Sequence, residues 1–147
     1  MSKEFGSMPL TWTKLGEYND KADLYLCDQI VAHMRFDPRS NEWNGSELQR
    51  WLNCEFYRQA FSDEQRKQIV GNEKTQDCVF LLSVEEFEKY KQRISGTHHY
   101  WWLRSPGSYT KYSKYSAFVN YKGDILNEGP GVIHYYGVRP AILLRNV

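Results

Sequence analysis

The chain has 147 residues, 16% of which are aromatic, and its 19 basic and 18 acidic residues leave a formal net charge of +1. This length suits one domain with a sizeable core, and the balanced charge argues against a nucleic-acid partner, which selects for a basic excess or stripe. Because the sequence shows no apolar run of about 18 residues, no signal peptide and only three widely spaced cysteines without a CxxC pair, we expect reduced thiols, no membrane span and a cytoplasmic or virion-associated protein.

The first eight residues read MSKEFGSM, with Gly6-Ser7 placed before a second methionine. This pattern is typical of a remnant left by an expression vector, or of a disordered segment. We therefore leave residues 1–8 out of the expected fold and predict a single domain over residues 9–147.

The N-terminal part of this domain reads as two strands and a loop. Leu10–Leu15 (LTWTKL) is rich in β-branched and aromatic residues and predicts a first strand, which ends at a turn signal over Tyr18–Lys21. Asp23–Met34 is apolar enough for a second strand with a short continuation. The polar segment Asp37–Gly45 then predicts a loop.

Three helices are expected in the middle of the chain, because a serine followed three residues later by Gln or Glu marks a helix start that closes a capping box. Apolar residues at helical spacing follow the first and third of these serines. A short apolar run, Asp77–Leu82, predicts a buried strand between the second and third helices. The helices and their capping pairs are Ser46–Phe61 with Ser46/Gln49, Ser62–Ile69 with Ser62/Gln65, and Ser83–Ile94 with Ser83/Glu86.

The C-terminal third predicts strands separated by turns. Pro140 in the last of them indicates a sheet edge or a bulge. Helices between strands at both ends of the chain indicate an α+β fold, in which the first and last strands pair and the two longer helices pack behind the sheet. The expected strands are Tyr100–Arg104, Ser116–Tyr121, Val132–Tyr136 and Val138–Leu144.

Four blocks of sequence stand out in chain order. They are Asn44–Phe61 (NGSELQRWLNCEFYRQAF), Thr75–Tyr90 (TQDCVFLLSVEEFEKY), Trp101–Gly107 (WWLRSPG) and Gly137–Leu144 (GVRPAILL). Their order resembles an uncharacterised bacterial and phage domain family, and the match extends from Leu10 to Leu144. The resemblance implies a C-type lectin-like fold, with two main helices packed on a small twisted antiparallel sheet and with paired N- and C-terminal strands.

A subset of such lectin-like domains are the variable proteins of diversity-generating retroelements. In those proteins a reverse-transcriptase system randomises codons near the C-terminus, and one face of the fold displays the changed side chains. The resemblance implies this role for the segment Gly107–Tyr136, which is rich in Tyr, Ser and Asn. Whether the segment is diversified is left open, because one sequence shows no variation.

The same segment supplies the candidate binding residues. Tyrosine offers a large contact area and a hydroxyl, serine adapts its hydrogen bonds, and lysine fits an acidic rim. A polar loop with incidental tyrosines is the alternative, and the adjacent Tyr135 and Tyr136 point to opposite faces if they lie on a strand. The candidate display surface comprises Tyr109, Lys111, Tyr112, Lys114, Tyr115, Asn120, Tyr121, Tyr135 and Tyr136.

The two blocks that frame this segment are expected to be structural. Trp101 and Trp102 lie on opposite faces of one strand, so at least one of them belongs to the core. Arg104 and Arg139 are expected to pair with carboxylates, or to donate to backbone carbonyls, rather than to bind an anionic ligand.

Metal binding finds little support in the sequence. A Ca²⁺ site needs clustered carboxylate and amide oxygens, and Asp124, Asn127 and Glu128 are too few, without the Glu-Pro-Asn and Trp-Asn-Asp patterns of calcium lectins. His98-His99 and His134 would need further ligands to hold a transition metal. We therefore expect no bound metal and no cofactor.

The sequence as a whole predicts a non-enzymatic ligand-recognition domain that binds a protein or a cell-surface glycan. It contains no GxSxG or P-loop motif. Formylglycine-generating enzymes share the lectin-like fold but use cysteines late in the chain, whereas the last cysteine here is Cys78. Two alternatives stay open: a structural or assembly module of a phage particle or surface protein, and a cryptic enzyme that gathers a histidine, a carboxylate and a serine. Homo-oligomerisation is also left open.

Overall fold

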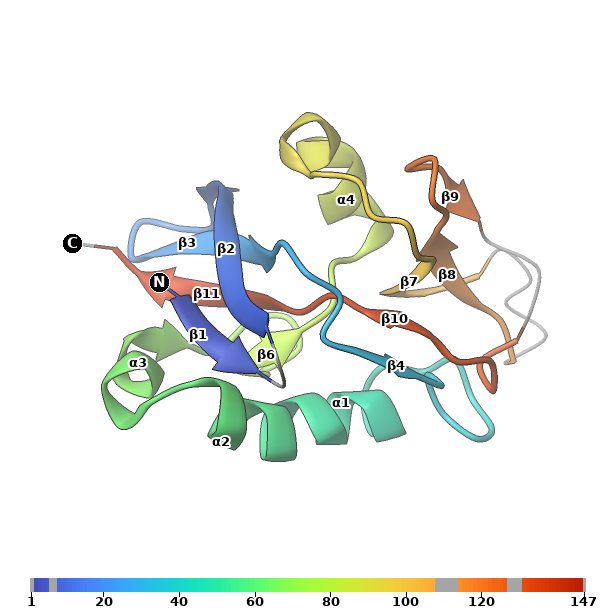
Figure 1. The fold of residues 1–147 in the computed structure, drawn as a ribbon, viewed down its shortest axis with the longest axis horizontal. Coiled ribbons are helices and arrows are strands. Elements are labelled where there is room, and N and C mark those ends of the chain that lie inside the picture. The colour runs from blue at the N-terminus through green and yellow to red at the C-terminus, as the bar shows by residue number, and fades with distance from the viewer. Residues whose placement is uncertain (1, 6–7, 108–113, 127–130, 147) are drawn as a thin grey trace.

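Two sheets, rather than one, organise the part of the chain that the structure describes. The computed structural model describes residues 2–5, 8–107, 114–126 and 131–146, and shows an α+β fold (Figure 1). The first sheet has the order β1 (Ser2–Phe5), β2 (Met8–Glu17), β3 (Ala22–Cys27), β11 (Ala141–Arg145) and β5 (Ile69–Val70), and β6 (Val79–Phe80) also pairs with β11. The second sheet has the order β4 (Ala32–Met34), β10 (Tyr136–Val138), β7 (Trp101–Pro106), β8 (Ser116–Val119) and β9 (Ile125–Leu126).

The N- and C-terminal strands belong to the same sheet but do not pair with each other. β3 lies between them, antiparallel to both β2 and β11. Residues 18–21 join β2 to β3 in a hairpin, and a short connection of this kind closes at a lower entropy cost than a long-range pairing. The direct pairing predicted from the sequence is therefore wrong. Ser2–Phe5, which we left out of the expected fold, pairs with the start of β2 as an edge strand. That residues 1–8 are a remnant of an expression vector stays a prediction.

Two short segments cross directly from one sheet to the other, without an intervening helix. The predicted strand Asp23–Met34 is divided into β3 and β4, and the predicted strand Val138–Leu144 is divided at Pro140 into β10 and β11. Pro140 has no N–H to donate to a sheet ladder, but its carbonyl accepts a hydrogen bond of 2.9 Å from the Cys27 N–H. The two crossings are thus bonded to each other where they leave the first sheet.

The predicted strand Val132–Tyr136 is wrong over most of its length. Residues 132–134 form a turn, and β10 begins only at Tyr136. The Val132 N–H donates to the Lys114 carbonyl at 2.7 Å, and the Val132 carbonyl accepts from the Phe36 N–H at 2.8 Å. These partners are distant in sequence, so the alternation of residues did not reveal the turn.

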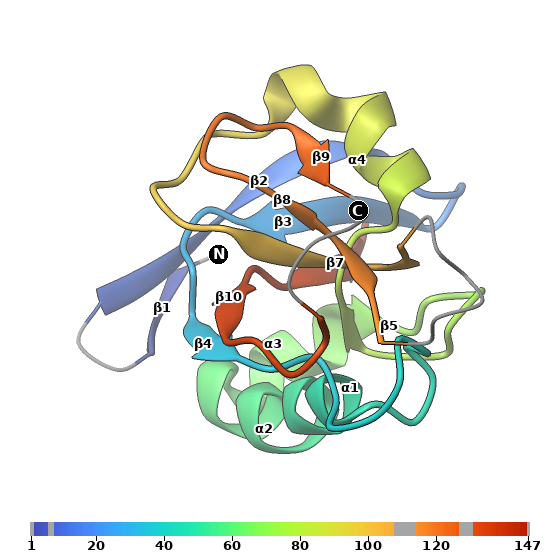
Figure 2. The ribbon, with the colours of Figure 1, turned by 90° about the vertical axis from the view of Figure 1, so that its right-hand side faces the viewer.

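Helices lie on both sides of the sheets. One helical segment runs through α1 (Glu47–Trp51), a π-helical turn (Leu52–Phe56) and α2 (Tyr57–Ala60), and is followed by α3 (Asp63–Gln68). On the opposite side, α4 (Val84–Tyr90) continues into a 3-10 turn (Lys91–Arg93) (Figures 1 and 2). The prediction that both longer helices pack behind one sheet is wrong, because the second sheet offers its own apolar face. On that face the Phe87 ring of α4 packs against Trp101, with ring centroids 5.6 Å apart.

The helix starts follow the predicted capping pattern at two of three serines. Reciprocal capping boxes at Ser62 and Ser83 are confirmed. Ser46 also accepts from the Gln49 N–H, at 3.0 Å, but the Gln49 side chain does not return the bond. Instead, its oxygen accepts from the Gly45 N–H and its nitrogen donates to Asp77 at 2.9 Å. The first box is therefore one-sided, because Asp77 competes for the glutamine.

Asn53, on the π-helical turn, joins the helical segment to β6. Its side-chain oxygen accepts from the backbone N–H groups of Cys78 and Val79, both at 2.9 Å. Its side-chain nitrogen donates to the Val79 carbonyl at 2.8 Å and to the Gln49 carbonyl at 2.9 Å. One side chain thereby links two of the four sequence blocks.

The two framing tryptophans are core residues, as predicted. Trp101 and Trp102 are both buried. Although Trp102 is enclosed, its indole N–H donates to the Met34 carbonyl at 2.9 Å, which satisfies the polar atom. None of the described helices is both long and apolar enough to cross a bilayer.

Candidate functional site

Six of the nine predicted display residues lie at three places on the second sheet, and the other three lie outside the described residues. Tyr109, Lys111 and Tyr112 lie outside the described residues. The other six lie at the ends of strands of the second sheet, at residues 114–115, 120–121 and 135–136. This edge of the molecule faces the viewer in Figure 2.

Four rings contact one another in sequence along this edge. Tyr121 stacks on Tyr100, with centroids 6.1 Å apart and an interplanar angle of 6°. Tyr100 meets the edge of Tyr136 at 5.4 Å, and Tyr136 is 6.4 Å from His134. We call these four residues the aromatic row. Tyr121 is 56% and Tyr100 37% exposed, so the stacked end of the row is open to solvent.

Tyr136 anchors the row in the core. Its ring lies 4.9 Å from Trp102 and 4.7 Å from Phe118, both of which are buried. Burial, with a smaller contribution from Tyr100, raises the pKa of Tyr136. The neighbouring Tyr135 is instead 66% exposed. Of this predicted pair, Tyr136 therefore supports the surface and Tyr135 extends from it.

Asn120 shapes the turn that carries Tyr121. Its side-chain oxygen accepts from the backbone N–H groups of Lys122 and Asp124, both at 2.9 Å. Gly123 has φ +86°, a conformation that a side chain disfavours, so the turn depends on this glycine. The side-chain oxygen of Asn120, a predicted display residue, is thus used inside the turn.

Lys114 and Tyr115 line a different hollow. With Pro38 and residues 131–134 they surround a cavity of ≈ 430 Å³. The Tyr115 carbonyl accepts from the Asn41 side chain at 2.7 Å, which fixes the end of β8. His134 lines this cavity and also ends the aromatic row, so the two features adjoin.

Two histidines meet near the aromatic row. His33 Nε2 and His99 Nδ1 are 3.3 Å apart, which links β4 to the segment before β7. Partial burial, followed by the neighbouring His99, lowers the pKa of His33. Among the described residues no cluster of three or more His, Cys, Asp or Glu side chains could hold a metal ion.

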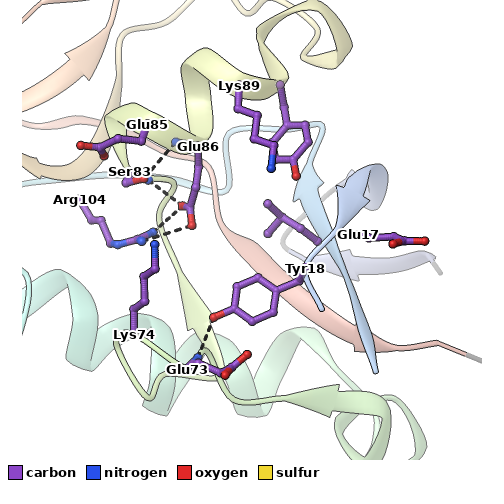
Figure 3. A pocket seen from close by; sticks show the side chains of 11 residues that line it. Glu17, Tyr18, Glu73, Lys74, Ser83, Glu85, Glu86, Lys89 and Arg104 are labelled. Carbon is purple, nitrogen blue, oxygen red and sulfur yellow. Dashed lines mark hydrogen bonds and ion pairs between the residues drawn. The ribbon is translucent and has the colours of Figure 1, made fainter. Parts of the chain in front are cut away.

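A larger cavity lies away from the aromatic row and is lined in part by Arg104. It has a volume of ≈ 630 Å³ and lies between α4, the end of β2 and residues 73–74 (Figure 3). Arg104 donates to Glu86 at 2.7 Å and to the Leu81 carbonyl at 2.7 Å, so the structural role predicted for this arginine is confirmed. The Tyr18 hydroxyl accepts from the Glu73 N–H at 2.9 Å.

Several of the polar groups that line this cavity bond other parts of the fold. Ser83 caps α4, and Glu86 is shared between that cap and Arg104. Its lining comes from four separate stretches of chain, so sequence reasoning missed it. No histidine is among the described residues that line it, so a Ser–His arrangement does not form there.

A family model described as a domain of unknown function (DUF6273) matches residues 22–98 and 87–146, which together cover most of the chain. The chain is a DUF6273 domain. Searches of curated proteins and of solved structures give no match. In this DUF6273 domain the four sequence blocks and the exposed rings Tyr100 and Tyr121 all lie within the matched stretches, and the two rings lie outside the blocks.

Proposed function

We propose that this DUF6273 domain is a non-enzymatic recognition domain whose aromatic row binds a protein or a cell-surface glycan. The observation that carries the proposal is the Tyr121–Tyr100 stack, in which both rings are exposed. Covering an aromatic ring that is open to solvent is favourable, and burying each one contributes on the order of 2 kcal/mol. A ligand that covered the stack would gain this energy.

The row is also ordered before a ligand arrives. Tyr100 contacts Phe118 as well as Tyr136, with centroids 5.7 Å and 5.4 Å away, so the exposed rings rest on the core. Tyrosine has few rotors to freeze, and rings already held by packing lose little further entropy on binding. This arrangement favours recognition over a floppy loop for the described part of the display surface.

The lectin-like fold and the diversified surface belong to the same proposal. β2 and β11 in one sheet, a second sheet built around the WWLRSPG strand, and two helical segments support a relative of the C-type lectin-like fold. Tyr121, His134 and Tyr136 come from the segment Gly107–Tyr136, which fits a variable region. A neighbouring reverse-transcriptase gene with a near-copy of this coding segment would support diversification; sibling sequences that change elsewhere but not here would contradict it.

Binding through the row is tested with a double variant, Tyr100→Ala/Tyr121→Ala. A displayed random-peptide library and a glycan array are screened with the unaltered domain, and the affinity of each selected ligand is then measured for both proteins. We expect at least a tenfold loss of affinity, because both stacked rings are removed, with a melting temperature lowered by only a few degrees. Tyr25→Ala, a half-buried tyrosine of β3 in the first sheet, serves as the matched control.

Three outcomes would contradict the proposal. Ligands that bind the double variant unchanged would show that the row is not the site. A double variant that unfolds would show that the rings are core residues. A stable oligomer at micromolar concentration, with Tyr121 protected from solvent, would favour the assembly module instead.

A further inference from the structure

A second, smaller hollow shares Tyr121 with the aromatic row. It has a volume of ≈ 210 Å³ and lies between residues 91–97, which follow α4, and residues 119–123, which lead out of β8. These two segments occupy the same end of the second sheet in both views (Figures 1 and 2). Its apolar lining residues are Phe87, Ile94, Trp101, Val119 and Tyr121. We call it the side-chain pocket.

The size of the pocket limits what it can hold. Sites for whole small-molecule ligands enclose about 300–1,000 Å³, and this pocket is smaller, at ≈ 210 Å³. It has room for one apolar side chain of a longer ligand. The apolar lining, with Trp101 beneath, suits an aromatic or branched aliphatic group.

Positive charge surrounds this apolar pocket. Lys91 and Lys122 line it, and no aspartate or glutamate is among its described lining residues. No carboxylate of the described residues lies within 4.0 Å of either ammonium group. Lys122 lies 5.9 Å from the centroid of the Tyr121 ring, at the boundary with the aromatic row.

A third cation stands behind the Trp101 ring. The Arg139 guanidinium is 5.0 Å from the centroid of that ring and is almost completely buried. It donates to the Ser95 carbonyl at 2.8 Å and to the Ser95 hydroxyl at 2.9 Å, and Ser95 is part of the pocket wall. Its hydrogen-bond acceptors are neutral oxygens, and the neighbouring Asp28 partly offsets its charge, so Lys91 and Lys122 supply the accessible positive charge at the pocket.

We propose that the side-chain pocket takes one apolar side chain from an acidic peptide segment of a partner protein, while Lys91 and Lys122 pair with the flanking carboxylates. This inference rests on the proposed function and deepens it, because it names the chemistry of the ligand. Charge complementarity favours an acidic peptide, because the pocket presents two exposed lysines beside an apolar floor. A neutral sugar would leave the two lysine charges unpaired.

Short probe peptides test the proposal directly. The probe is acetyl-Gly-Glu-Phe-Glu-Gly-amide, and its two comparison peptides replace either both glutamates by lysine or the phenylalanine by alanine. Each is titrated into the ¹⁵N-labelled domain and followed by NMR. We expect the acidic phenylalanine peptide to shift the amide signals of residues 95–97 and 120–123, and each comparison peptide to bind at least tenfold more weakly.

Charge reversal supplies the second arm. In the variant Lys91→Glu/Lys122→Glu we expect the acidic peptide to lose at least tenfold in affinity and the lysine peptide to gain. The matched control Lys21→Glu/Lys67→Glu changes the net charge equally at exposed positions away from the pocket. Both variants exchange exposed side chains, so the folded NMR spectrum is expected to persist.

The outcomes separate this inference from the proposed function. Equal binding of the acidic and lysine peptides, or equal losses in the two charge variants, would overturn the acidic-peptide assignment. Ligands that depend on Tyr100 and Tyr121 but not on Lys91 and Lys122, including neutral glycans, would also overturn it while leaving the recognition function in place.

Discussion

Arg139 illustrates how one residue can join three parts of a fold. Its guanidinium donates to the Cys27 carbonyl at 2.7 Å, where the chain leaves β3, and to Ser95 after α4. Burial lowers the pKa of Arg139, while the neighbouring Asp28 opposes this shift. Burial also raises the pKa of the Cys27 thiol to about 11, which keeps it neutral beside the cation at pH 7. The structural role expected for Arg139 is confirmed, with carbonyl and hydroxyl oxygens as its partners.

Replacing Arg139 by methionine is expected to destabilise the domain strongly. Three oxygens lose a charged donor, and hydrogen bonds to charged groups contribute about 1.5–3 kcal/mol each, with losses that do not add fully. We predict that the free energy of unfolding, measured in urea, falls by about 3 kcal/mol. Arg145→Met, at an exposed position at the end of β11, should change it by less than about 0.5 kcal/mol. Similar effects of the two substitutions would contradict the bridging role.

At the scale of elements, the π-helical turn explains why the first helical segment can bond a strand. A π-helical turn widens the backbone spiral and changes the direction in which its side chains point. Asn53, on this turn, bonds backbone groups of β6 with both ends of its carboxamide. β6 is only two residues long and pairs with β11, so the asparagine supplements a short ladder.

Asn53→Ala is expected to leave backbone groups of β6 without partners. Unsatisfied buried polar groups cost about 1–3 kcal/mol each, and water can restore part of the loss. We predict that the free energy of unfolding decreases by about 3 kcal/mol, and that hydrogen exchange accelerates at the Cys78 and Val79 amides. Gln59→Ala, exposed on α2, is the control. Unchanged exchange at those two amides would show that Asn53 is not their protector.

Element boundaries were predictable where the signal was local. Two of the capping boxes and the hairpin turn after β2 need only neighbouring residues. Pro140 indicated a sheet edge or a bulge, but the change of sheet there and the turn at Val132 depend on partners far along the chain, which period and composition did not reveal. For the same reason the sequence suggested one sheet where the structure has two.

At the scale of the whole molecule, the two sheets are built as one unit. β3 leads into β4 and β10 leads into β11, and longer connections run from β4 to β5 and from β6 to β7, so the chain passes between the sheets four times. Arg139 bonds both sides of this junction. Sheets connected and bonded in this way should not unfold separately.

A single cooperative transition is therefore expected in urea. The chain has five tryptophans, with Trp12 in the first sheet and Trp101 and Trp102 in the second. Labelled with 5-fluorotryptophan, each gives its own ¹⁹F NMR signal, and we predict that all the folded signals disappear with the same midpoint. Earlier loss of the Trp101 and Trp102 signals would mean that the second sheet unfolds first.

The candidate site was only partly visible in the sequence. Tyr121 was predicted as a surface residue, and the structure leaves it exposed, because it lies in the turn held by Asn120 and Gly123. Tyr100 was assigned to a strand that frames the site, and its stacking on Tyr121 depends on the pairing of β7 with β8. Asn120 was predicted to face a ligand, but its oxygen is engaged within its own turn.

The Asn120 turn has a further consequence for how this surface can change. The backbone there is held by the Asn120 side chain and by the left-handed Gly123, so the shape of the turn does not depend on the ring of Tyr121. Position 121 can thus accept many side chains without refolding its surroundings. Evolution or a laboratory library could exchange that one residue, while Asn120 and Gly123 hold the backbone so that each new side chain starts from the same position.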